Sequence, residues 1–390
     1  MKQQNSILST RSTAALLFGG MLGVFVVASG TYTVLPTLSS ISLTGGTVLA
    51  IGTSTNAIIP QLKPVLDTVA YDRRLLALAH VATSSPWYQG FIAGATSTTV
   101  VVTPASTTTA EVTKTIYPLW PARKAYPNVG ALLPFNRIVA YYGNFYSKGM
   151  GILGEYPEEV VLQKLLAEKA AWEAADPTTP VMPAIEYIDV TAQGSAGKDG
   201  KYRLRMPDSQ VDKALTMAQK IDAIVILDIQ VGLSTLPEEL PLLDKYWKMP
   251  QVHLALDPEF AMHNGKAPGR VIGSMSAEDI NYAINYLSKI VRDNNLPPKI
   301  LVVHRFTQDM VTGYRAIHPT PEVQVVVQMD GWGSPQRKKN TYRVVVEPEP
   351  VQFTGLKVFY KNDLKETPSR LLTPQEILNL TPAPSFIQYQ

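Results

Sequence analysis

The chain has 390 residues, a formal net charge of +3 and no cysteine. An apolar content of 45% beside 17% charged residues indicates a packed core and excludes a disordered chain. The missing cysteine excludes disulfides, thiolate zinc sites and a thiol nucleophile. Six of the 35 basic and three of the 32 acidic residues lie in residues 1–120, which leaves 29 of each sign for the remainder. This balance provides no concentrated basic patch, so nucleic acid is not expected as a partner.

The first 35 residues have the pattern of a signal peptide or signal anchor. Lys2 and Arg11 precede an uncharged, apolar run over 12–35. Such a run is long enough to span a bilayer, which takes roughly 17 to 25 residues, and Ala28-Ser29-Gly30 is a candidate cleavage site. Basic residues before the run would send the rest of the chain outside the cell. The sequence therefore predicts a membrane partner through this segment with the domain facing outside, or secretion if the signal is cleaved.

Residues 36–134 form a second region that is rich in Thr, Ser and Pro. Residues 95–109 are close to low complexity, which is typical of a spacer. Within this region Val65 to His80 has helical apolar spacing and predicts one short helix. We predict that residues before about Pro134 are attachment, and that residues 135–390 form the main domain.

The main domain alternates strand-like and helix-like segments, which is typical of βαβ units around a parallel sheet. The predicted strands are 137–143, 181–188, 223–230, 252–257, 299–306 and 323–330. Predicted helices cover 157–175 and 238–248 and begin at Asp208 and Ser276, where Ser276 and Asp279 have the spacing of a capping box.

The end of the chain is less regular. Residues 342–347 and 356–361 both look like strands, but about eight residues join them, too few for a helical crossover. The predicted fold class is therefore α/β, a (β/α)8-type TIM barrel, complete or degenerate in its last strands. An open doubly wound sheet is the alternative. Against it, Gly143-Asn-Phe-Tyr-Ser after the first strand lacks the glycine spacing that a dinucleotide needs, and no cofactor is expected.

The fourth predicted strand ends in two carboxylates. Strand alternation puts Asp257 and Glu259 on one face, and Pro258 ends regular pairing between them. Active sites of α/β barrels lie at the carboxyl ends of the strands. Two carboxylates at that end could supply a general acid of raised pKa beside an ionised base or nucleophile.

The same alternation directs polar residues of the other strands to the barrel mouth. The candidate catalytic residues are Glu259, Asp257 and Asp228, although Asp228 could equally cap a loop. The candidate substrate-binding residues are Glu186, Gln230, His304, Gln328, Asp330, Tyr142 and Trp332. Tyr142 and Trp332 could stack on sugar rings or serve in packing.

A barrel with strand-end carboxylates and an Asp-x-Glu on the fourth strand resembles the (β/α)-barrel glycoside hydrolases, including the lysozyme-like muramidases. The resemblance covers roughly 136–363. It implies cleavage of glycosidic bonds, with Glu259 as general acid, Asp257 as its electrostatic or nucleophilic partner, and a carbohydrate or cell-wall polymer as ligand. The phrases Asp257-Pro-Glu-Phe and Met329-Asp-Gly-Trp-Gly are also similar to exported bacterial proteins whose activity is not known.

Three functions follow from these patterns. The first is an exported, membrane-tethered glycoside hydrolase acting on an envelope or environmental polysaccharide. The second is a non-catalytic glycan-binding or envelope-spacing protein. The third is a metal-dependent hydrolase using the carboxylates with His304, although H-x-H and H-E-x-x-H patterns are missing.

Overall fold

The computed structural model describes residues 65–94, 98–102, 112–116, 119–122 and 124–390. The predicted signal segment lies outside this part of the chain. Among the described residues, no helix has both the length and the apolar character needed to cross a bilayer.

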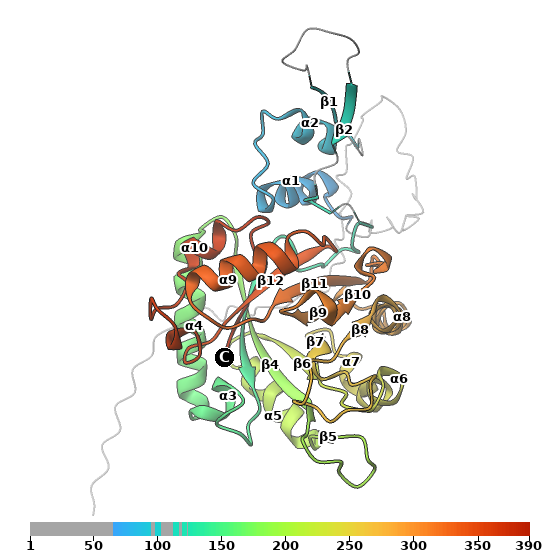
Figure 1. The fold of residues 1–390 in the computed structure, drawn as a ribbon, viewed down its shortest axis with the longest axis vertical. Helices are drawn as coiled ribbons and strands as arrows, with labels where there is room; N and C mark the ends of the chain where they lie inside the picture. Colours follow the sequence, from blue (N-terminus) through green and yellow to red (C-terminus); the bar gives the residue numbers. More distant parts are fainter. Residues whose placement is uncertain (1–64, 95–97, 103–111, 117–118, 123) are drawn as a thin grey trace, which may run out of the picture. The chain divides into compact units, whose positions relative to one another are not determined.

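Eight parallel strands form a closed barrel, which confirms the predicted TIM-type architecture (Figure 1). The strands are β3 (Arg137–Gly143), β4 (Val181–Ala192), β6 (Ile224–Ile229), β7 (Val252–Leu256), β9 (Lys299–Arg305), β11 (Val323–Met329), β12 (Phe353–Val358) and β13 (Phe386–Tyr389). Closure occurs where β3 pairs with β13 on one side and β4 on the other. This closure rules out the open doubly wound sheet.

Helices follow most strands and cover the outer surface of the barrel (Figure 1). They are α3 (Ile152–Glu155), α4 (Glu158–Ala175), α5 (Asp208–Gln219), α6 (Leu236–Glu239), α7 (Asp244–Trp247), α8 (Ala277–Asn294), α9 (Pro335–Thr341) and α10 (Pro374–Leu378). The predicted capping box at the start of α8 is confirmed, because Ser276 Oγ accepts the Asp279 N–H and the Asp279 carboxylate accepts the Ser276 N–H. Short strand β5 (Arg203–Arg205) pairs antiparallel with the extended end of β4.

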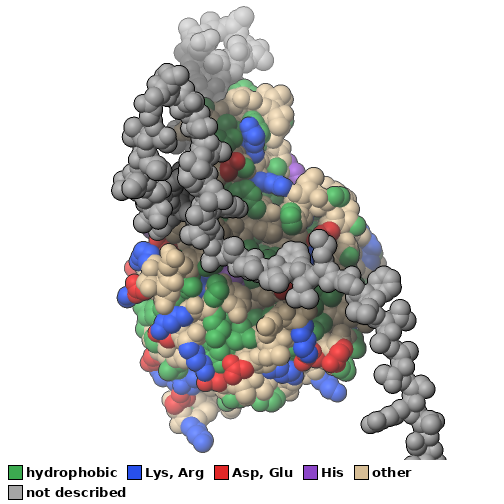
Figure 2. Space-filling view, turned by 180° about the vertical axis from the view of Figure 1, so that it is seen from behind, with side chains coloured by type: hydrophobic (Ala, Val, Ile, Leu, Met, Phe, Trp, Pro, Cys, Tyr) green, Lys and Arg blue, Asp and Glu red, His purple; other side chains and the backbone are tan. Residues whose placement is uncertain are grey.

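Outward-facing strand residues and the helices share one large apolar core. On β6 the outward residues Val225, Leu227 and Ile229 are fully buried in it. The apolar and polar faces that strand alternation predicted for β6 are therefore the covered and interior faces of the barrel. On the face seen in Figure 2, Lys and Arg side chains are interspersed with Asp and Glu.

The structure corrects the predicted end of the barrel. Residues 342–347 are not a strand, because Tyr342–Val346 continues α9 as a π-helix and buries Tyr342 and Val346 against the barrel. The Tyr342 hydroxyl donates to Pro382 O at 2.5 Å. The strand predicted at 356–361 lies at Phe353–Val358, and the eighth strand, Phe386–Tyr389, was missed. The three consecutive valines at 344–346 have a local preference for a strand, but packing against the barrel stabilises the helix.

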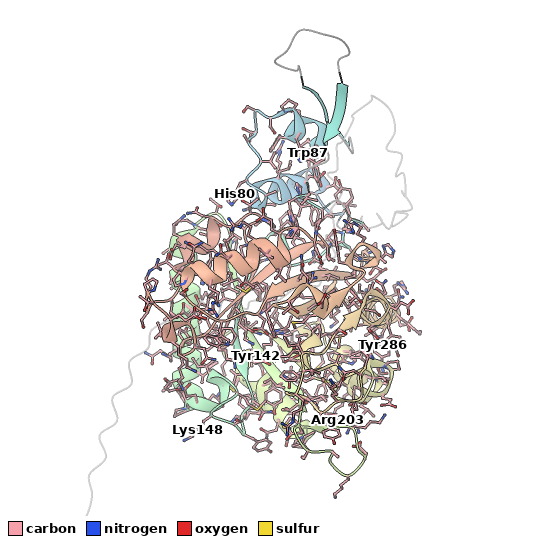
Figure 3. All side chains as sticks on the ribbon, viewed as in Figure 1. His80, Trp87, Tyr142, Lys148, Arg203 and Tyr286 are labelled. Carbon is pink, nitrogen blue, oxygen red and sulfur yellow. The ribbon has the colours of Figure 1, made fainter. Side chains whose placement is uncertain are left out.

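The predicted helix between 65 and 80 is present as α1 (Thr68–Leu78). It is followed by α2 (Pro86–Ile92) and by the antiparallel pair β1 (Thr98–Val102) and β2 (Val112–Ile116). Figure 3 shows His80 and Trp87 at this end of the structure and Tyr142 within the barrel.

Helix α1 packs against the amino-terminal opening of the barrel. Tyr71, Leu75 and Leu76 share a second apolar cluster with interior residues near the strand starts, such as Ile138 and Ile300. The Ala383 N–H donates to Leu78 O at 2.7 Å. Part of the region predicted as spacer thus covers one end of the barrel interior.

We expect this cover to stabilise the domain. Leu76 is fully buried, and its truncation in Leu76→Ala should cost about 2–5 kcal/mol of unfolding free energy. A protein lacking residues 1–131 should melt at a lower temperature, because the cluster beneath α1 becomes exposed. Val69→Ala, at a side chain 43% exposed, is the matched control and should change stability by less than about 0.5 kcal/mol. Equal stability of Leu76→Ala and Val69→Ala in denaturant titrations would mean that α1 does not support the fold.

Candidate active site

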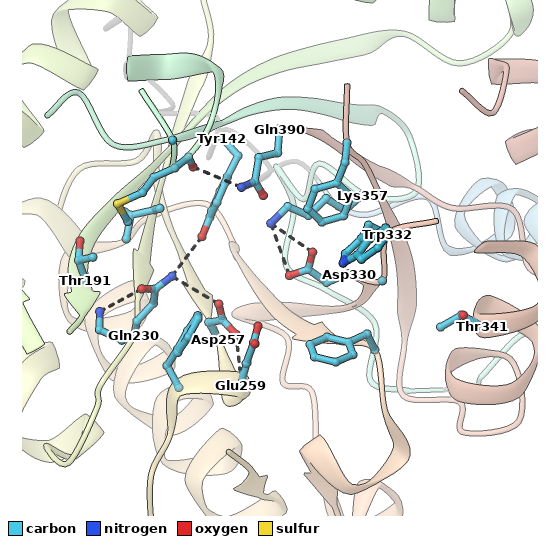
Figure 4. Close-up of a pocket in the computed structure, with 18 of the residues that line it drawn as sticks. Tyr142, Thr191, Gln230, Asp257, Glu259, Asp330, Trp332, Thr341, Lys357 and Gln390 are labelled. Carbon is cyan, nitrogen blue, oxygen red and sulfur yellow. Dashed lines mark hydrogen bonds and ion pairs between the residues drawn. The ribbon is translucent and has the colours of Figure 1, made fainter. Parts of the chain in front are cut away.

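A cavity of about 760 Å³ opens at the carboxyl ends of the barrel strands. Three carboxylates line it, those of Asp257, Glu259 and Asp330. Tyr142 and Trp332 line the same cavity (Figure 4). Its size and its few converging polar groups are those of a small-molecule or oligomer site.

Asp257 and Glu259 reach the cavity from the turn that follows β7. The strand ends at Leu256, and a short 3-10 turn begins at Pro258, so regular pairing stops where the proline predicted it. Asp257 Oδ1 caps this turn by accepting the Glu259 N–H at 3.1 Å. Asp257 is buried and Glu259 half-buried. Strand alternation brings Asp257 to the interior after Ala255, and the turn brings Glu259 to the same cavity.

A hydrogen-bonded network lies behind Asp257. Gln230 Nε2 donates to Asp257 Oδ2 at 3.4 Å and to the Tyr142 hydroxyl at 3.2 Å (Figure 4). The Tyr142 hydroxyl donates to Asp228 Oδ2 at 2.8 Å. Gln230 is fixed in turn by the Ala192 N–H, which donates to its Oε1 at 3.0 Å. These bonds hold Asp257 in one orientation.

Asp330 lies between two cations. His304 Nδ1 bonds Asp330 Oδ2 at 2.9 Å, and Lys357 Nζ lies 3.2 Å from Asp330 Oδ1. His304 Nε2 bonds Glu186 Oε1 at 3.1 Å, and both of these side chains are fully buried. The Lys357 ammonium also lies 3.9 Å from the centre of the Tyr142 ring. Adjacent strands β9, β11 and β12 bring His304, Asp330 and Lys357 together, whereas Glu186 lies on β4 and Tyr142 on β3.

The environment moves the carboxylate pKa values in opposite directions. Burial raises the pKa of Asp257 well above its ordinary value, and the negative charges of Asp228 and Asp330 add to this against the opposing effect of His304. Burial, followed by the charge of Asp330, also raises the pKa of Glu259. Burial alone would raise the pKa of Asp330, but Lys357 and His304 outweigh it and lower that pKa. One carboxylate with a lowered pKa thus shares the cavity with two whose pKa values are raised.

The histidine behind Asp330 is held in its charged form. Burial lowers the pKa of His304, but hydrogen bonds to the carboxylates of Asp330 and Glu186 outweigh this effect and raise that pKa well above the ordinary value. Both ring nitrogens then act as donors.

The predicted site residues fall into two groups. The first group lines the cavity and consists of Tyr142, Gln230, Asp257, Glu259, Asp330 and Trp332. The second group is fully buried beneath it and consists of Asp228, Glu186, His304 and Gln328. None of these four residues lines the cavity. Asp228, predicted as catalytic, accepts a hydrogen bond from the Tyr142 hydroxyl, and His304 bonds Asp330. Glu186 bonds His304, and Gln328 bonds Gln388.

Sequence reasoning missed several residues that line the cavity. Lys357 is the most important, because it pairs with Asp330. The available signal was a lysine between Leu356 and Val358, in a segment predicted as a strand, since a buried lysine needs a partner. Arg337, Phe306 and Gln390 also line the cavity and were not predicted.

Within the described part of the chain, no three His, Asp or Glu side chains are arranged to hold a metal ion. The cavity carboxylates bond to Gln230, His304 and Lys357 instead.

Comparisons with known proteins give no family. No protein-family model and no curated protein matches the chain. Among solved structures, a hyperthermophilic endo-β-1,4-glucanase in complex with substrate aligns with a TM-score of 0.31 at 11% identity, over 54% of this chain and 77% of that one. A ruminal GH26 endo-β-1,4-mannanase aligns with a TM-score of 0.33 at 10% identity, over 65% of this chain and 58% of that one. Scores this low do not show a shared family or activity.

The buried Asp228 should make stability depend on pH. Burial is the main cause that raises its pKa to about 6, against an ordinary value of 3.8. Its contribution to stability is therefore full below pH 3.8 and is lost as the pH rises through 6. Asp228→Asn keeps an acceptor for Tyr142 and removes this loss, which amounts to about 3 kcal/mol.

Unfolding free energies of wild type and Asp228→Asn, measured from pH 4 to pH 8, check this prediction. The variant should gain relative to wild type as the pH rises. Asp309→Asn, at an exposed position, controls for the loss of one charge. Parallel curves for wild type and Asp228→Asn would contradict the raised pKa.

Proposed function

We propose that this barrel is a hydrolase of glycosidic bonds in a polysaccharide, with Glu259 as general acid. The observation that carries the proposal is the opposite direction of the pKa shifts of Glu259 and Asp330, which face one cavity. Glycosidic cleavage needs a protonated carboxyl at the leaving oxygen and an ionised carboxylate beside the sugar ring.

Glu259 would donate its proton to the glycosidic oxygen as the bond breaks. Asp330, kept ionised by Lys357 and His304, would stabilise the positive charge that develops at the sugar. The sequence assigned this second role to Asp257. Its raised pKa favours a different role, in which a neutral Asp257 fixes the turn that carries Glu259.

Aromatic side chains around the cavity support a carbohydrate ligand. Trp332 is 45% exposed, which is unusual for so large an apolar group. Phe260 ends the turn after β7 and Phe306 directly follows β9, and both side chains are half-buried and line the cavity. Sugar rings present apolar faces that such side chains can cover.

We also propose that the barrel works outside the cytoplasmic membrane. Support comes from the sequence of residues 1–35, where Lys2 and Arg11 precede the apolar run. Protease added to intact spheroplasts should degrade the barrel, and a cytoplasmic marker protein should survive. Full protection of the barrel until the membrane is lysed would reverse the proposed orientation.

The catalytic proposal predicts the behaviour of two variants. Glu259→Gln should lower kcat on an accepted glycan by roughly 10² to 10⁴-fold, because the proton donor is lost, and should leave glycan binding almost unchanged. Asp330→Asn should also abolish most turnover. Glu278→Gln, on an exposed part of α8, is the control and should retain activity. Full activity in both cavity variants would refute the assignment of Glu259 and Asp330. A wild type that binds the glycan but does not hydrolyse it would indicate a binding protein.

The pH profile gives an independent check. Activity requires ionised Asp330 and protonated Glu259, so kcat/KM should rise as the pH passes the lowered pKa of Asp330 and fall as it passes the raised pKa of Glu259. Lys357→Met should move the acidic limb to higher pH, because Asp330 loses the cation that most lowers its pKa. An acidic limb at the same pH in Lys357→Met would contradict this account.

A further inference from the structure

Arg337 is held at one edge of the cavity by a fixed carboxylate. Its Nη1 lies 2.9 Å from Glu366 Oε1. The other oxygen of Glu366 accepts the Ser334 N–H at 2.9 Å. The backbone thus orients Glu366, and Glu366 orients the guanidinium of Arg337.

The absence of a side chain at Gly333 leaves room for the aliphatic part of the Arg337 side chain. This glycine has φ +146°, in the region that favours glycine. A Cβ at this position would lie 2.5 Å from Arg337 Cδ and 3.2 Å from Arg337 Cγ. Any other residue at position 333 would therefore displace the side chain of Arg337.

The guanidinium keeps unused donors. An arginine side chain carries five N–H groups, and Glu366 is the one partner of this guanidinium among the described residues. The side chain of Arg337 is 60% exposed and lines the cavity. The edge formed by Nη2 and Nε can bind a carboxylate with two parallel hydrogen bonds.

Trp332 provides an aromatic surface in the same cavity. It precedes Gly333 in the chain, and its side chain is 45% exposed. Lys365 Nζ lies 5.9 Å from the centre of the Trp332 ring, which adds a second positive charge to this edge. A sugar ring stacked on Trp332 would lie in the cavity that Arg337 also lines.

The other carboxylates of the cavity do not oppose an anion at this edge. Asp330 already has two cationic partners, Lys357 and His304. Burial raises the pKa values of Asp257 and Glu259, which lowers the tendency of both side chains to ionise. The charges beside Trp332 and Gly333 are the positive charges of Arg337 and Lys365, partly balanced by Glu366.

We propose that the glycan bound by this cavity contains a sugar that bears a carboxylate, which pairs with Arg337 while the sugar ring stacks on Trp332. This inference rests on the proposed function for the nature of the ligand as a carbohydrate. It adds the chemical class of the sugar: an acidic sugar, such as a hexuronic acid, occupies the subsite formed by Trp332, Gly333 and Arg337.

Binding measurements with the full chain test this subsite. The probes are tetramers of galacturonate and of mannuronate, and the same tetramers after reduction of their carboxyl groups. Wild type should bind at least one acidic tetramer more tightly than its reduced form, by roughly ten- to a hundredfold, the range of a charge-assisted hydrogen bond. Arg337→Gln should remove this difference, and Arg337→Lys should restore part of it. Trp332→Ala should weaken both forms.

Lys339→Gln is the matched control, because Lys339 lies on the same helix but pairs with Glu376 and does not line the cavity. This variant should keep the preference for the acidic tetramer. Melting temperatures of all variants show whether the fold is retained. A preference that survives Arg337→Gln in a folded protein overturns the inference, as does a wild type that binds acidic and reduced tetramers equally.

The two proposals fail in different ways. Binding of an acidic tetramer that Arg337→Gln weakens, without any cleavage of acidic glycans, supports the subsite and removes the hydrolase. Cleavage of a polysaccharide by a wild type that binds acidic and reduced tetramers equally supports the hydrolase and removes the subsite.

Discussion

The site depends on one buried ionic arrangement, in which Asp330 lies between His304 and Lys357. An ionised carboxylate with almost no exposure is costly unless cations and hydrogen bonds compensate for lost water. Here the compensation comes from the two strands that flank β11, namely β9 and β12. The parallel register of a closed barrel therefore sets the charge of Asp330, because it brings all three strand ends to the same level.

The fixed charge of Asp330 affects the remaining carboxylates. It contributes to the raised pKa of both Asp257 and Glu259, after burial. The pKa of the same kind of side chain is thus lowered at Asp330 and raised at Asp257 and Glu259. The difference between these pKa shifts arises because the two cations, His304 and Lys357, lie on the strands beside Asp330.

The sequence predicted those parts of the structure that local patterns determine. Period-two alternation identified six strands and directed Asp228, Asp257 and Asp330 to the interior end of the barrel. It failed where distant contacts decide: Tyr342–Val346 is helical because it packs on the barrel, and Phe386–Tyr389 is a strand of only four residues. The sequence pattern also could not predict the pKa shift of Asp257, because this shift depends on burial and on charged neighbours from other strands. Arg337 lines the cavity because Gly333 leaves room for its side chain and Glu366 pairs with its guanidinium. No sequence spacing indicated these two contacts.

The interior of the barrel changes character along each strand. On β3 the interior residues Ile138 and Ala140 belong to the apolar cluster under α1, and Tyr142 belongs to the site. On β9 Ile300 and Val302 precede His304 in the same way. Interior side chains of such barrels stack in layers. The lower layers are apolar and covered by α1, so the upper layer can carry several titratable groups while the apolar packing below supplies stability.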